Sequence, residues 1–511
     1  MSFRRAGQVA ATVFLIVLWM ACGQVYRPVV LPCSEGGLPG CPVEAPPTPA
    51  GFHAVFGITM NVPNYPGGAM QIDVAGDSII GETPTSDKSA PNLGNNPTNA
   101  IYASTQGRVF VTSAGSVVPG EVDVVSSFTP AFQSLTASGL GEVDTIGLPL
   151  GSLPVFVNST ENARIYVANF GTASVSQINT TINVISNTAS VGANPVALAE
   201  IPNGTKLYVA NQGSNSVTSL NTVDMSANVL SGFTGITPVW AVARSDSQKV
   251  YVLTQGDGQL VTIDTATDTV TSSLPVGAGA DFVLYDPNLN RLYVTNPATG
   301  TVYIFSATGG LSGGVATDTP VQLASISFGA GSAACPTGCL PASVTALPDG
   351  SRFYVASYQT AAACPDPFVG AATSCVIPSL AVFDANNFTL KSTLTLLTDP
   401  PFAANLATNK YQYAVPQVAG CATAALYSPS SIRFRVFTTA STDSSRVYVG
   451  MCDAGVIAVI NTTGSNTNNS GGAGNPADTL VTDLPAAFSG GPIQPNGLPA
   501  NQNPIFLVTG Q

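Results

Sequence analysis

Short apolar stretches alternate with turn residues along most of this chain, and this pattern predicts strands. The stretch around residue 200 is representative, with four strand-like runs at Pro195–Ile201, Lys206–Asn211, Ser216–Asn221 and Asn228–Phe233. A turn, Pro202-Asn203-Gly204, separates the first two runs, and these residue types favour a tight reversal. No segment between Pro97 and Leu484 sustains a 3.6-residue hydrophobic period, so we expect an all-β protein.

One phrase recurs seven times: a basic residue, an apolar residue, Phe or Tyr, and Val. The phrases begin at Arg108, Arg164, Lys206, Lys249, Arg291, Arg352 and Arg446, which we call the anchors. The central anchors are 42, 43 and 42 residues apart, whereas the outer spacings of 56, 61 and 94 contain insertions. Four short strands in each such period are typical of a propeller blade. The chain is therefore expected to form a seven-bladed β-propeller of four-stranded antiparallel blades over residues 70–485.

The repeats resemble the YVTN family of β-propeller repeats. The resemblance rests on Tyr293-Val294-Thr295-Asn296 and, with alanine in place of threonine, on Tyr166–Asn169 and Tyr208–Asn211. It is specific in the second to fifth repeats and weaker in the others. The resemblance implies a seven-bladed ring in a surface or periplasmic protein, and it implies no single activity.

Each anchor is expected to begin the second strand of its blade, just after a turn. There its aliphatic stem would cover apolar surface and its charged head would reach water; a ligand-binding ring of positive charge is the alternative. Ring closure requires a strand from one terminus. Met70–Glu82, Thr479–Leu484 and Ile505–Thr509 are the candidates for the outer strand of the seventh blade, and residues 486–511 form a tail that could supply it.

The N-terminal sequence is typical of an export signal. Arg4 and Arg5 precede an apolar run from Val9 to Ala21, which is too short to span a bilayer but suits a signal peptide. The run ends at Ala21-Cys22-Gly23, which resembles a bacterial lipoprotein signal. Removal of residues 1–21 would leave Cys22 to carry the lipid, with the Pro- and Gly-rich residues 22–69 as a tether and N-terminal segment. The expected location is the outer membrane, the cell surface or the periplasm.

Eight cysteines remain when Cys22 is set aside, and an even number in an exported chain indicates disulfides. Pairing by sequence proximity gives Cys33–Cys41, Cys335–Cys339, Cys364–Cys375 and Cys421–Cys452, one of about 105 connectivities. A zinc cluster is the alternative. It is disfavoured because the chain has no Cys-x-x-Cys spacing and one histidine, His53.

Three insertions are expected on one face of the ring. In a four-stranded blade, the link between strands two and three lies on the same face as the link to the next blade. This topology gathers the insertions 329–341, 358–378 and 397–430, together with Cys452, near the fifth to seventh repeats. The candidate binding residues there are Tyr358, Asp366, Phe368, Asp399, Phe402, Lys410, Tyr411, Tyr413, Tyr427 and Asp453. Loops on a rigid scaffold often bind ligands, although loops that only plug the channel are the alternative.

The net charge and the residue counts disfavour several classes of function. A formal net charge of −12, with 9 % charged residues, argues against nucleic acid, whose phosphates require clustered Lys and Arg. Because His53 is the only histidine, any Ser–His–Asp triad would have to use it. Metal or haem sites with several histidines are disfavoured for the same reason. We therefore expect no catalytic residue, cofactor or metal. The preferred function is a non-catalytic lipoprotein scaffold that binds a protein, a glycan or an envelope component. A lactonase-like hydrolase with carboxylates or a metal at the channel mouth, and a surface-layer component, are the alternatives.

Overall fold

The computed structural model describes residues 54–61, 65–74, 77–85, 96–104, 106–115, 120–126, 142–160, 162–309, 311–312, 315–316, 318–397, 404–405, 410–463, 477–485 and 503–509. The chain divides into two units, residues 1–50 and 51–511, and every described residue belongs to the second. The proposed signal peptide, Cys22, Cys33, Cys41 and His53 lie outside the described residues.

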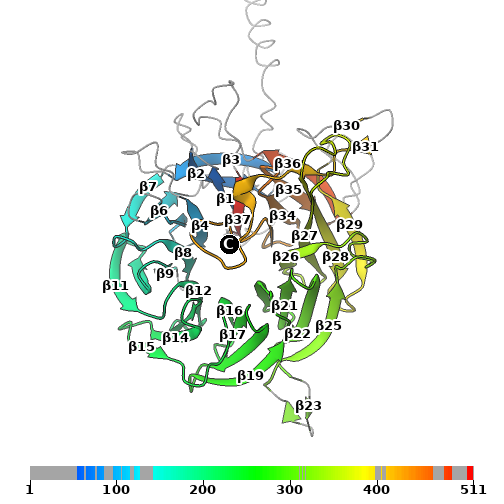
Figure 1. Ribbon diagram of the computed structural model, residues 1–511. Coiled ribbons are helices and arrows are strands. Elements are labelled where there is room, and N and C mark those ends of the chain that lie inside the picture. Colours follow the sequence, from blue (N-terminus) through cyan, green and yellow to red (C-terminus); the bar gives the residue numbers. More distant parts are fainter. Residues whose placement is uncertain are drawn as a thin grey trace, which may run out of the picture. The chain divides into compact units, whose positions relative to one another are not determined.

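The described strands form eight antiparallel blades arranged in a ring (Figure 1). From the innermost strand outward, blade 1 is β37 (Asn503–Thr509), β1 (Ala54–Asn61), β2 (Tyr65–Asp73) and β3 (Ser78–Thr85). Blade 2 is β4 (Pro97–Ala103), β5 (Arg108–Ser113), β6 (Glu121–Ser126) and β7 (Glu142–Gly147). Blade 3 is β8 (Pro154–Asn158), β9 (Arg164–Asn169), β10 (Ser174–Asn179) and β11 (Val184–Ser190). Blade 4 is β12 (Pro195–Glu200), β13 (Lys206–Asn211), β14 (Ser216–Asn221) and β15 (Ala227–Val229).

The second half of the ring repeats the same order. Blade 5 is β16 (Pro238–Ala243), β17 (Lys249–Thr254), β18 (Gln259–Asp264) and β19 (Thr269–Pro275). Blade 6 is β20 (Phe282–Asp286), β21 (Arg291–Asn296), β22 (Thr301–Ser306) and β25 (Val321–Ser327). Blade 7 is β26 (Leu340–Ala346), β27 (Arg352–Ala361), β28 (Cys375–Asp384) and β29 (Leu390–Thr395). Blade 8 is β33 (Val436–Ala440), β34 (Arg446–Met451), β35 (Val456–Asn461) and β36 (Thr479–Pro485).

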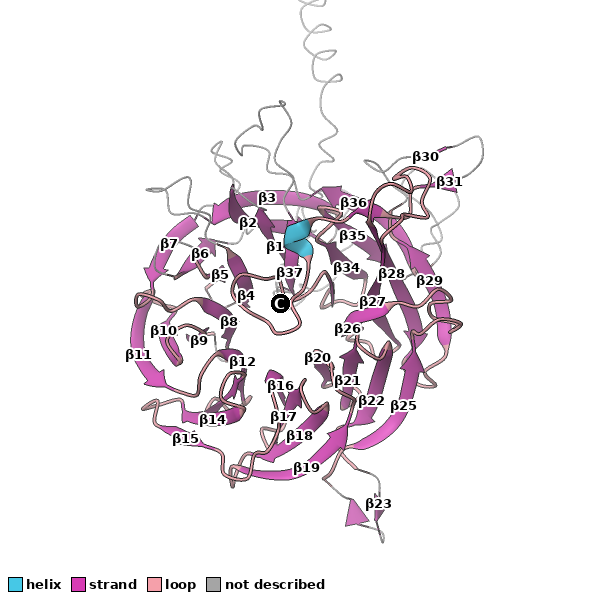
Figure 2. Cartoon of the chain, viewed as in Figure 1, coloured by secondary structure: helices cyan, strands magenta, loops and turns pink. Residues whose placement is uncertain are grey.

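Small elements lie between the blades. A short hairpin, β23 (Leu311–Ser312) and β24 (Val315–Ala316), interrupts blade 6. Between blades 7 and 8 lie β30 (Ala404–Asn405), β31 (Lys410–Tyr411), β32 (Val415–Pro416) and a 3-10 helix at Ala419–Cys421, the cyan element near the centre of Figure 2. Because β32 pairs with β28, this insertion joins the sheet of blade 7.

The expected count of seven blades is wrong, because the two ends of the chain together build an eighth. Strands β1–β3 come from the N-terminal side, and β37 pairs with β1 from the other end of the chain. In register, Ala54 lies opposite Asp73, just as the anchor Lys249 lies opposite Asp264. This blade carries alanine where the other seven carry a basic residue, so counting anchors misses it.

The same finding corrects the expected closure of the ring. Residues 70–82 run through β2 and β3 of blade 1, and 479–484 belong to the outer strand of blade 8. The residues that close the ring are 503–509, as an inner strand of blade 1 rather than as an outer strand. The propeller strands therefore extend beyond the expected limits of 70 and 485.

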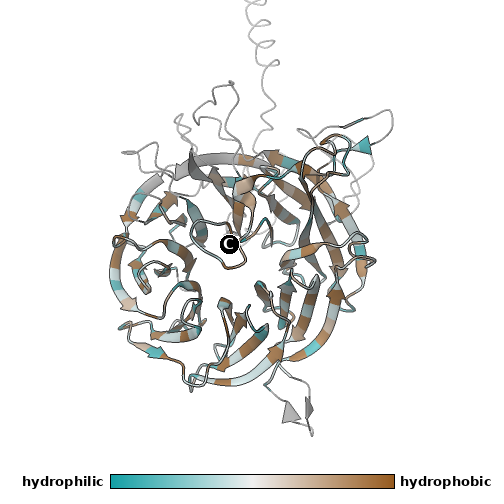
Figure 3. Cartoon of the chain, viewed as in Figure 1, coloured by the Kyte–Doolittle hydropathy of each residue, from teal (hydrophilic) through white to brown (hydrophobic). Residues whose placement is uncertain are grey.

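Burial falls from the inner to the outer strands. The middle strands are almost fully buried, whereas the outer strands alternate; β19 is exposed at every second residue, which Figure 3 shows as alternating colours. The aromatic residue of the anchor phrase contributes most to the core. Six of the largest fully buried side chains are the phrase tyrosines Tyr166, Tyr208, Tyr251, Tyr293, Tyr354 and Tyr448. Each lies between two blade faces, so burial of the phrase packs neighbouring blades together.

The sequence predicts that the charged heads of the anchors reach water, and the structure corrects this expectation. Each of the seven anchors donates to a residue of the following blade. For the anchors in chain order, the acceptors are Asn183, Thr222, Thr265, Asp318, Ala385, Thr462 and Asp77. The Lys206 ammonium, for example, donates to the Thr265 carbonyl at 2.7 Å and pairs with Asp268 at 2.9 Å. The heads are satisfied within the fold, so they form inter-blade latches rather than a ligand-binding ring.

Candidate functional site

The three insertions share one face of the ring, which we call the loop face. It comprises the links from strand four to the next blade and the links from strand two to strand three. Three disulfides lie on this face, Cys335–Cys339, Cys364–Cys375 and Cys421–Cys452, with Cα–Cα distances of 5.8, 5.4 and 5.7 Å. These are the pairs that sequence proximity predicts. Disulfides of this kind are typical of an oxidising, extracytoplasmic compartment.

Asp366 holds the insertion of blade 7 against the segment after β31. Its Oδ2 accepts hydrogen bonds from the backbone N–H groups of Tyr413 at 2.6 Å and Ala414 at 2.9 Å. Its Oδ1 accepts from the N–H of Phe368 at 2.8 Å. The side chain is fully buried. A fully buried carboxylate whose two oxygens accept hydrogen bonds from three backbone N–H groups acts as a structural clamp.

Asp453 has a similar role on blade 8. Arg435 donates to both of its oxygens, Nε to Oδ2 at 2.6 Å and Nη2 to Oδ1 at 2.8 Å. The N–H of Val418 donates to Oδ1 at 2.8 Å. The Arg435 guanidinium also lies 5.6 Å from the ring centroid of Tyr358, whose pKa is raised by burial. This bidentate pair ties the insertion to β33 beside the Cys421–Cys452 disulfide.

Residues 417–435, which we call the crossing segment, reach over the mouth of the channel. The side chain of Gln212 in blade 4 donates to the Tyr427 carbonyl at 3.2 Å. Arg433 donates from Nη1 to the Val196 carbonyl at 2.9 Å and from Nη2 to the Val239 carbonyl. The segment leaves blade 7 and contacts blades 4 and 5, so it spans the centre of the ring, as the orange trace in Figure 1 shows.

Aromatic rings fill the centre of the ring below the crossing segment. Trp240 lies 5.3 Å from Phe156, 5.1 Å from Phe282 and 5.5 Å from Phe434, centroid to centroid. Phe437 contacts Phe282 at 6.0 Å. Phe434 comes from the end of the crossing segment, and the other rings come from blades 3, 5, 6 and 8. All of these rings are buried, so side chains close the channel at this level.

Arg433 is the charged group at the centre of this arrangement. Its guanidinium lies 4.4 Å from the Trp240 ring and 5.0 Å from the Tyr427 ring, a cation–π geometry. Its Nε is buried without a hydrogen-bond partner. Burial lowers the pKa of Arg433 and raises the pKa of Tyr427 to about 12. Burial also raises the pKa of the half-buried Asp281, an effect that Arg433 opposes.

The remaining predicted residues are less constrained. Lys410 is exposed, Tyr411 is half-buried, and Phe368 is 38 % exposed. Asp399 and Phe402 lie outside the described residues. Arg433 and Trp240 are absent from the sequence-predicted set, although the sequence carries a signal for the first. Arg433 and Arg435, two of the chain's 16 basic residues, are separated by a single residue just after the insertion 397–430.

Large apolar side chains are exposed on the loop face. Leu426 of the crossing segment is 56 % exposed, within an exposed run at 422–426. Leu150 and Ile236, in links between other blades on this face, are 82 % and 49 % exposed. Within the described ranges, no three His, Cys, Asp or Glu side chains gather closely enough to hold a metal ion. Among the same residues, no helix has the length and apolar character needed to cross a membrane.

Comparison with known proteins yields structural similarity alone. No protein-family model and no curated protein sequence matches this chain. Among solved structures, hydrazine synthase from Kuenenia stuttgartiensis is 15 % identical, with 67 % of this chain and 90 % of that chain covered at a TM-score of 0.42. The periplasmic gluconolactonase of Pseudomonas aeruginosa is 14 % identical, with 67 % and 95 % covered at 0.46. The Cps50 β-propeller domain from Myceliophteria thermophila is 10 % identical, with 72 % and 97 % covered at 0.47. The architecture rests on the strand pairing described above, and these similarities add no argument about function.

Proposed function

We propose that this protein is a non-catalytic, lipid-anchored scaffold of the cell envelope that binds a partner protein through its loop face. One observation carries the proposal: disulfides fasten the three insertions, the carboxylates Asp366 and Asp453 are engaged within the protein, and apolar side chains stay exposed. Preorganised loops lose little entropy on binding. Exposed aliphatic and aromatic side chains such as Leu426 and Phe368 suit a protein surface better than a glycan, which requires many converging polar groups.

The path of the chain is consistent with binding through the loop face. β1 begins at the anchor end of its blade, which is opposite the loop face, and β37 ends there as well. The described chain therefore enters the propeller at the face opposite the loop face, so this entry point does not occupy the proposed binding surface.

The hydrolase alternative is less well supported. Acid–base chemistry at the channel mouth would require a carboxylate with a free oxygen near an open cavity. Asp366 and Asp453 are engaged by backbone N–H groups and by Arg435, and aromatic rings fill the channel below the crossing segment. The observed engagement of these carboxylates therefore favours the binding function.

Site-specific photo-crosslinking in cells tests the partner. A photoreactive amino acid is placed at Leu426 and, as a matched control, at Val223, which is 81 % exposed at a turn on the opposite face. We expect one protein to crosslink from Leu426 and not from Val223, and the purified partner to bind with a Kd that Leu426→Asp weakens at least tenfold. Equal crosslinking from both positions, or unchanged binding by Leu426→Asp, would contradict the proposal.

Intact-mass measurement tests the anchor independently. Protein from the membrane fraction should begin at Cys22 and carry a diacyl or triacyl adduct. Thiols should appear only after reduction. An unprocessed or unlipidated chain would remove the membrane anchor from the proposal while leaving the partner experiment valid.

A further inference from the structure

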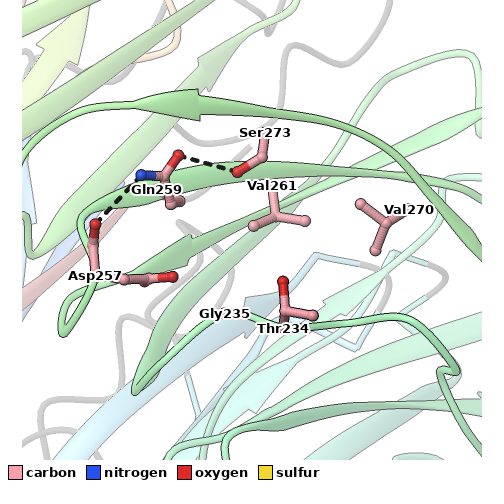
Figure 4. Close-up of a pocket in the computed structure, with 7 residues that line it drawn as sticks. All are labelled: Thr234, Gly235, Asp257, Gln259, Val261, Val270 and Ser273. Carbon is pink, nitrogen blue, oxygen red and sulfur yellow. Dashed lines mark hydrogen bonds between the residues drawn. The ribbon is translucent and has the colours of Figure 1, made fainter.

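A second site lies in blade 5, apart from the crossing segment. A pocket of about 280 Å³ opens between the link before β16 and the outer half of the blade. Thr234 and Gly235 line it from the link, Asp257 lines it from the turn between β17 and β18, and Val261 and Val270 form an apolar wall. Figure 4 shows the side chain of Asp257 directed into this space beside Thr234.

Blade 5 departs from the other blades at these positions. The third residue after the second strand is Thr172 in blade 3 and Ser214 in blade 4, and each hydroxyl pairs with a neighbouring serine at 2.9 and 2.8 Å. The equivalent residue in blade 5 is Asp257. The link before β16 has eight residues, 230–237, compared with four, 191–194, before β12. Two separate changes to the repeat thus meet at one pocket.

Among the described residues, no hydrogen-bond donor or cation is paired with the carboxylate of Asp257. Its Oδ1 is buried without a hydrogen bond, and no cation of the described residues pairs with it. A buried carboxylate oxygen without a donor is costly, which makes it a strong acceptor for a ligand. The observation therefore indicates a ligand that donates hydrogen bonds and carries positive charge.

The other polar groups of the pocket are mostly acceptors. The Gln259 side-chain amide donates to the Asp257 carbonyl at 3.3 Å, and the Ser273 hydroxyl donates to Gln259 Oε1 at 3.0 Å. One N–H of the Gln259 amide and the Ser273 hydroxyl proton are therefore used within the wall. A neutral sugar requires both donors and acceptors from its site, and Ca²⁺ requires about six to eight oxygen ligands. An ammonium group, with three donors and no acceptor, matches the groups that remain.

We infer that this pocket binds a primary ammonium group on a short aliphatic stem. Asp257 and the Thr234 hydroxyl would accept from the ammonium, and Val261 and Val270 would contact the methylene groups. Such a group occurs in a free alkylamine and in a lysine side chain. The formal net charge of −12 favours the approach of either cation. This inference does not rest on the proposed partner function.

Titration of the full chain with n-butylamine, followed by saturation-transfer NMR in an amine-free buffer, tests the site. We expect n-butylammonium to bind and the neutral n-butanol, of the same shape, to bind at least tenfold more weakly. Asp257→Asn should weaken n-butylammonium binding about tenfold or more, because a charge-assisted hydrogen bond is lost. Thr234→Val should cause a smaller loss.

Asp224→Asn is the matched control, since it removes one negative charge from an exposed turn outside the pocket. It should leave binding unchanged, and thermal unfolding should show that all variants fold. Nα-acetyl-lysine methylamide distinguishes the two sources: tighter binding than n-butylamine assigns the site to a lysine side chain, and weaker binding assigns it to a free amine. Equal binding of n-butylamine and n-butanol, or equal losses in the Asp257 and Asp224 variants, would overturn the inference.

Discussion

In the latches of Lys206, Lys249 and Arg352, the tyrosine of the anchor phrase also donates a hydrogen bond to the following blade. At the junction of blades 4 and 5, Asp268 accepts from Tyr208 at 2.5 Å, from Ser219 at 2.9 Å and from the Lys206 ammonium at 2.9 Å. Burial raises the pKa of Asp268, but these three donors outweigh burial and leave the pKa below its ordinary value. The charged form is therefore the one that stabilises the junction.

Asp268→Asn should lower the free energy of unfolding by about 1–3 kcal/mol at neutral pH, since it weakens charge-assisted hydrogen bonds. The folded pKa is depressed, so the contribution of Asp268 is present above about pH 4 and is lost as the pH falls further. Denaturant unfolding at neutral and acidic pH measures both effects. The difference between wild type and variant should shrink on acidification.

Asp224→Asn again serves as the control, because asparagine keeps the acceptor oxygen for Ser226 while removing the charge. It should leave the free energy of unfolding nearly unchanged, because the side chain lies on the exposed surface. Equal losses in both variants would show that net charge, and not the latch, produces the effect.

At the scale of elements, the crossing segment is fastened at both ends of its span. Cys421–Cys452 and the Arg435–Asp453 pair hold it to blade 8, and Arg433 and Gln212 hold it to blades 4 and 5. It has little regular secondary structure of its own, so these contacts determine its position. Long irregular loops held this way open locally when a fastening is removed.

Cys421→Ser with Cys452→Ser should therefore increase hydrogen exchange in residues 417–435 while blades 3–5 keep their protection. The disulfide joins residues separated by 31 positions, for which the loss of loop-closure entropy in the unfolded chain stabilises the fold by about 3–4 kcal/mol. Hydrogen exchange with mass spectrometry locates the opening. The double variant Cys335→Ser with Cys339→Ser is the control, because this disulfide lies outside the crossing segment. Its separation of 4 residues corresponds to a stabilisation of about 2 kcal/mol from loop-closure entropy. Uniform exchange across all blades would contradict local fastening.

At the scale of the whole molecule, the ring is closed by non-covalent pairing of its two ends. β37 is held by the ladder to β1 and by contacts with the inner strands of blades 2 and 8. Six phrase tyrosines repeat around this ring, each fully buried. Burial raises the pKa of Tyr166 and Tyr293 to about 12, and it raises those of the other four still further.

Alkaline pH should therefore unfold the ring cooperatively. An unfolded tyrosine titrates near pH 10, so the stability contributed by the raised pKa values is complete below about pH 10 and is lost as the pH rises toward 12. Tyrosinate absorbance and circular dichroism should change together in one steep transition. Gradual ionisation of all 15 tyrosines with the fold intact would contradict the prediction.

The repeat pattern predicts blades 2–8 closely. In the blade that contains Lys206, the first three expected runs match β12, β13 and β14 within one residue at each boundary, because local turns and alternating side chains specify each meander. The fourth expected run, Asn228–Phe233, extends four residues beyond the end of β15. Blade 1 could not be counted in this way, since Ala54 replaces the anchor and its strands come from opposite ends of the chain. The gathering of the insertions follows from blade topology, but the roles of Asp366 and Asp453 depend on which backbone N–H groups meet them.

The sequence by itself determines the strand pattern, the proximity of the three described cysteine pairs and the face on which the loops lie, because each depends on local turns and on the fixed order of strands in a blade. Only the tertiary structure decided the number of blades, the inter-blade latches, the position of Arg433 over Trp240 and the pocket at Asp257. These features join residues far apart in the chain, and packing around the closed ring sets their distances. No short-range pattern encodes such distances.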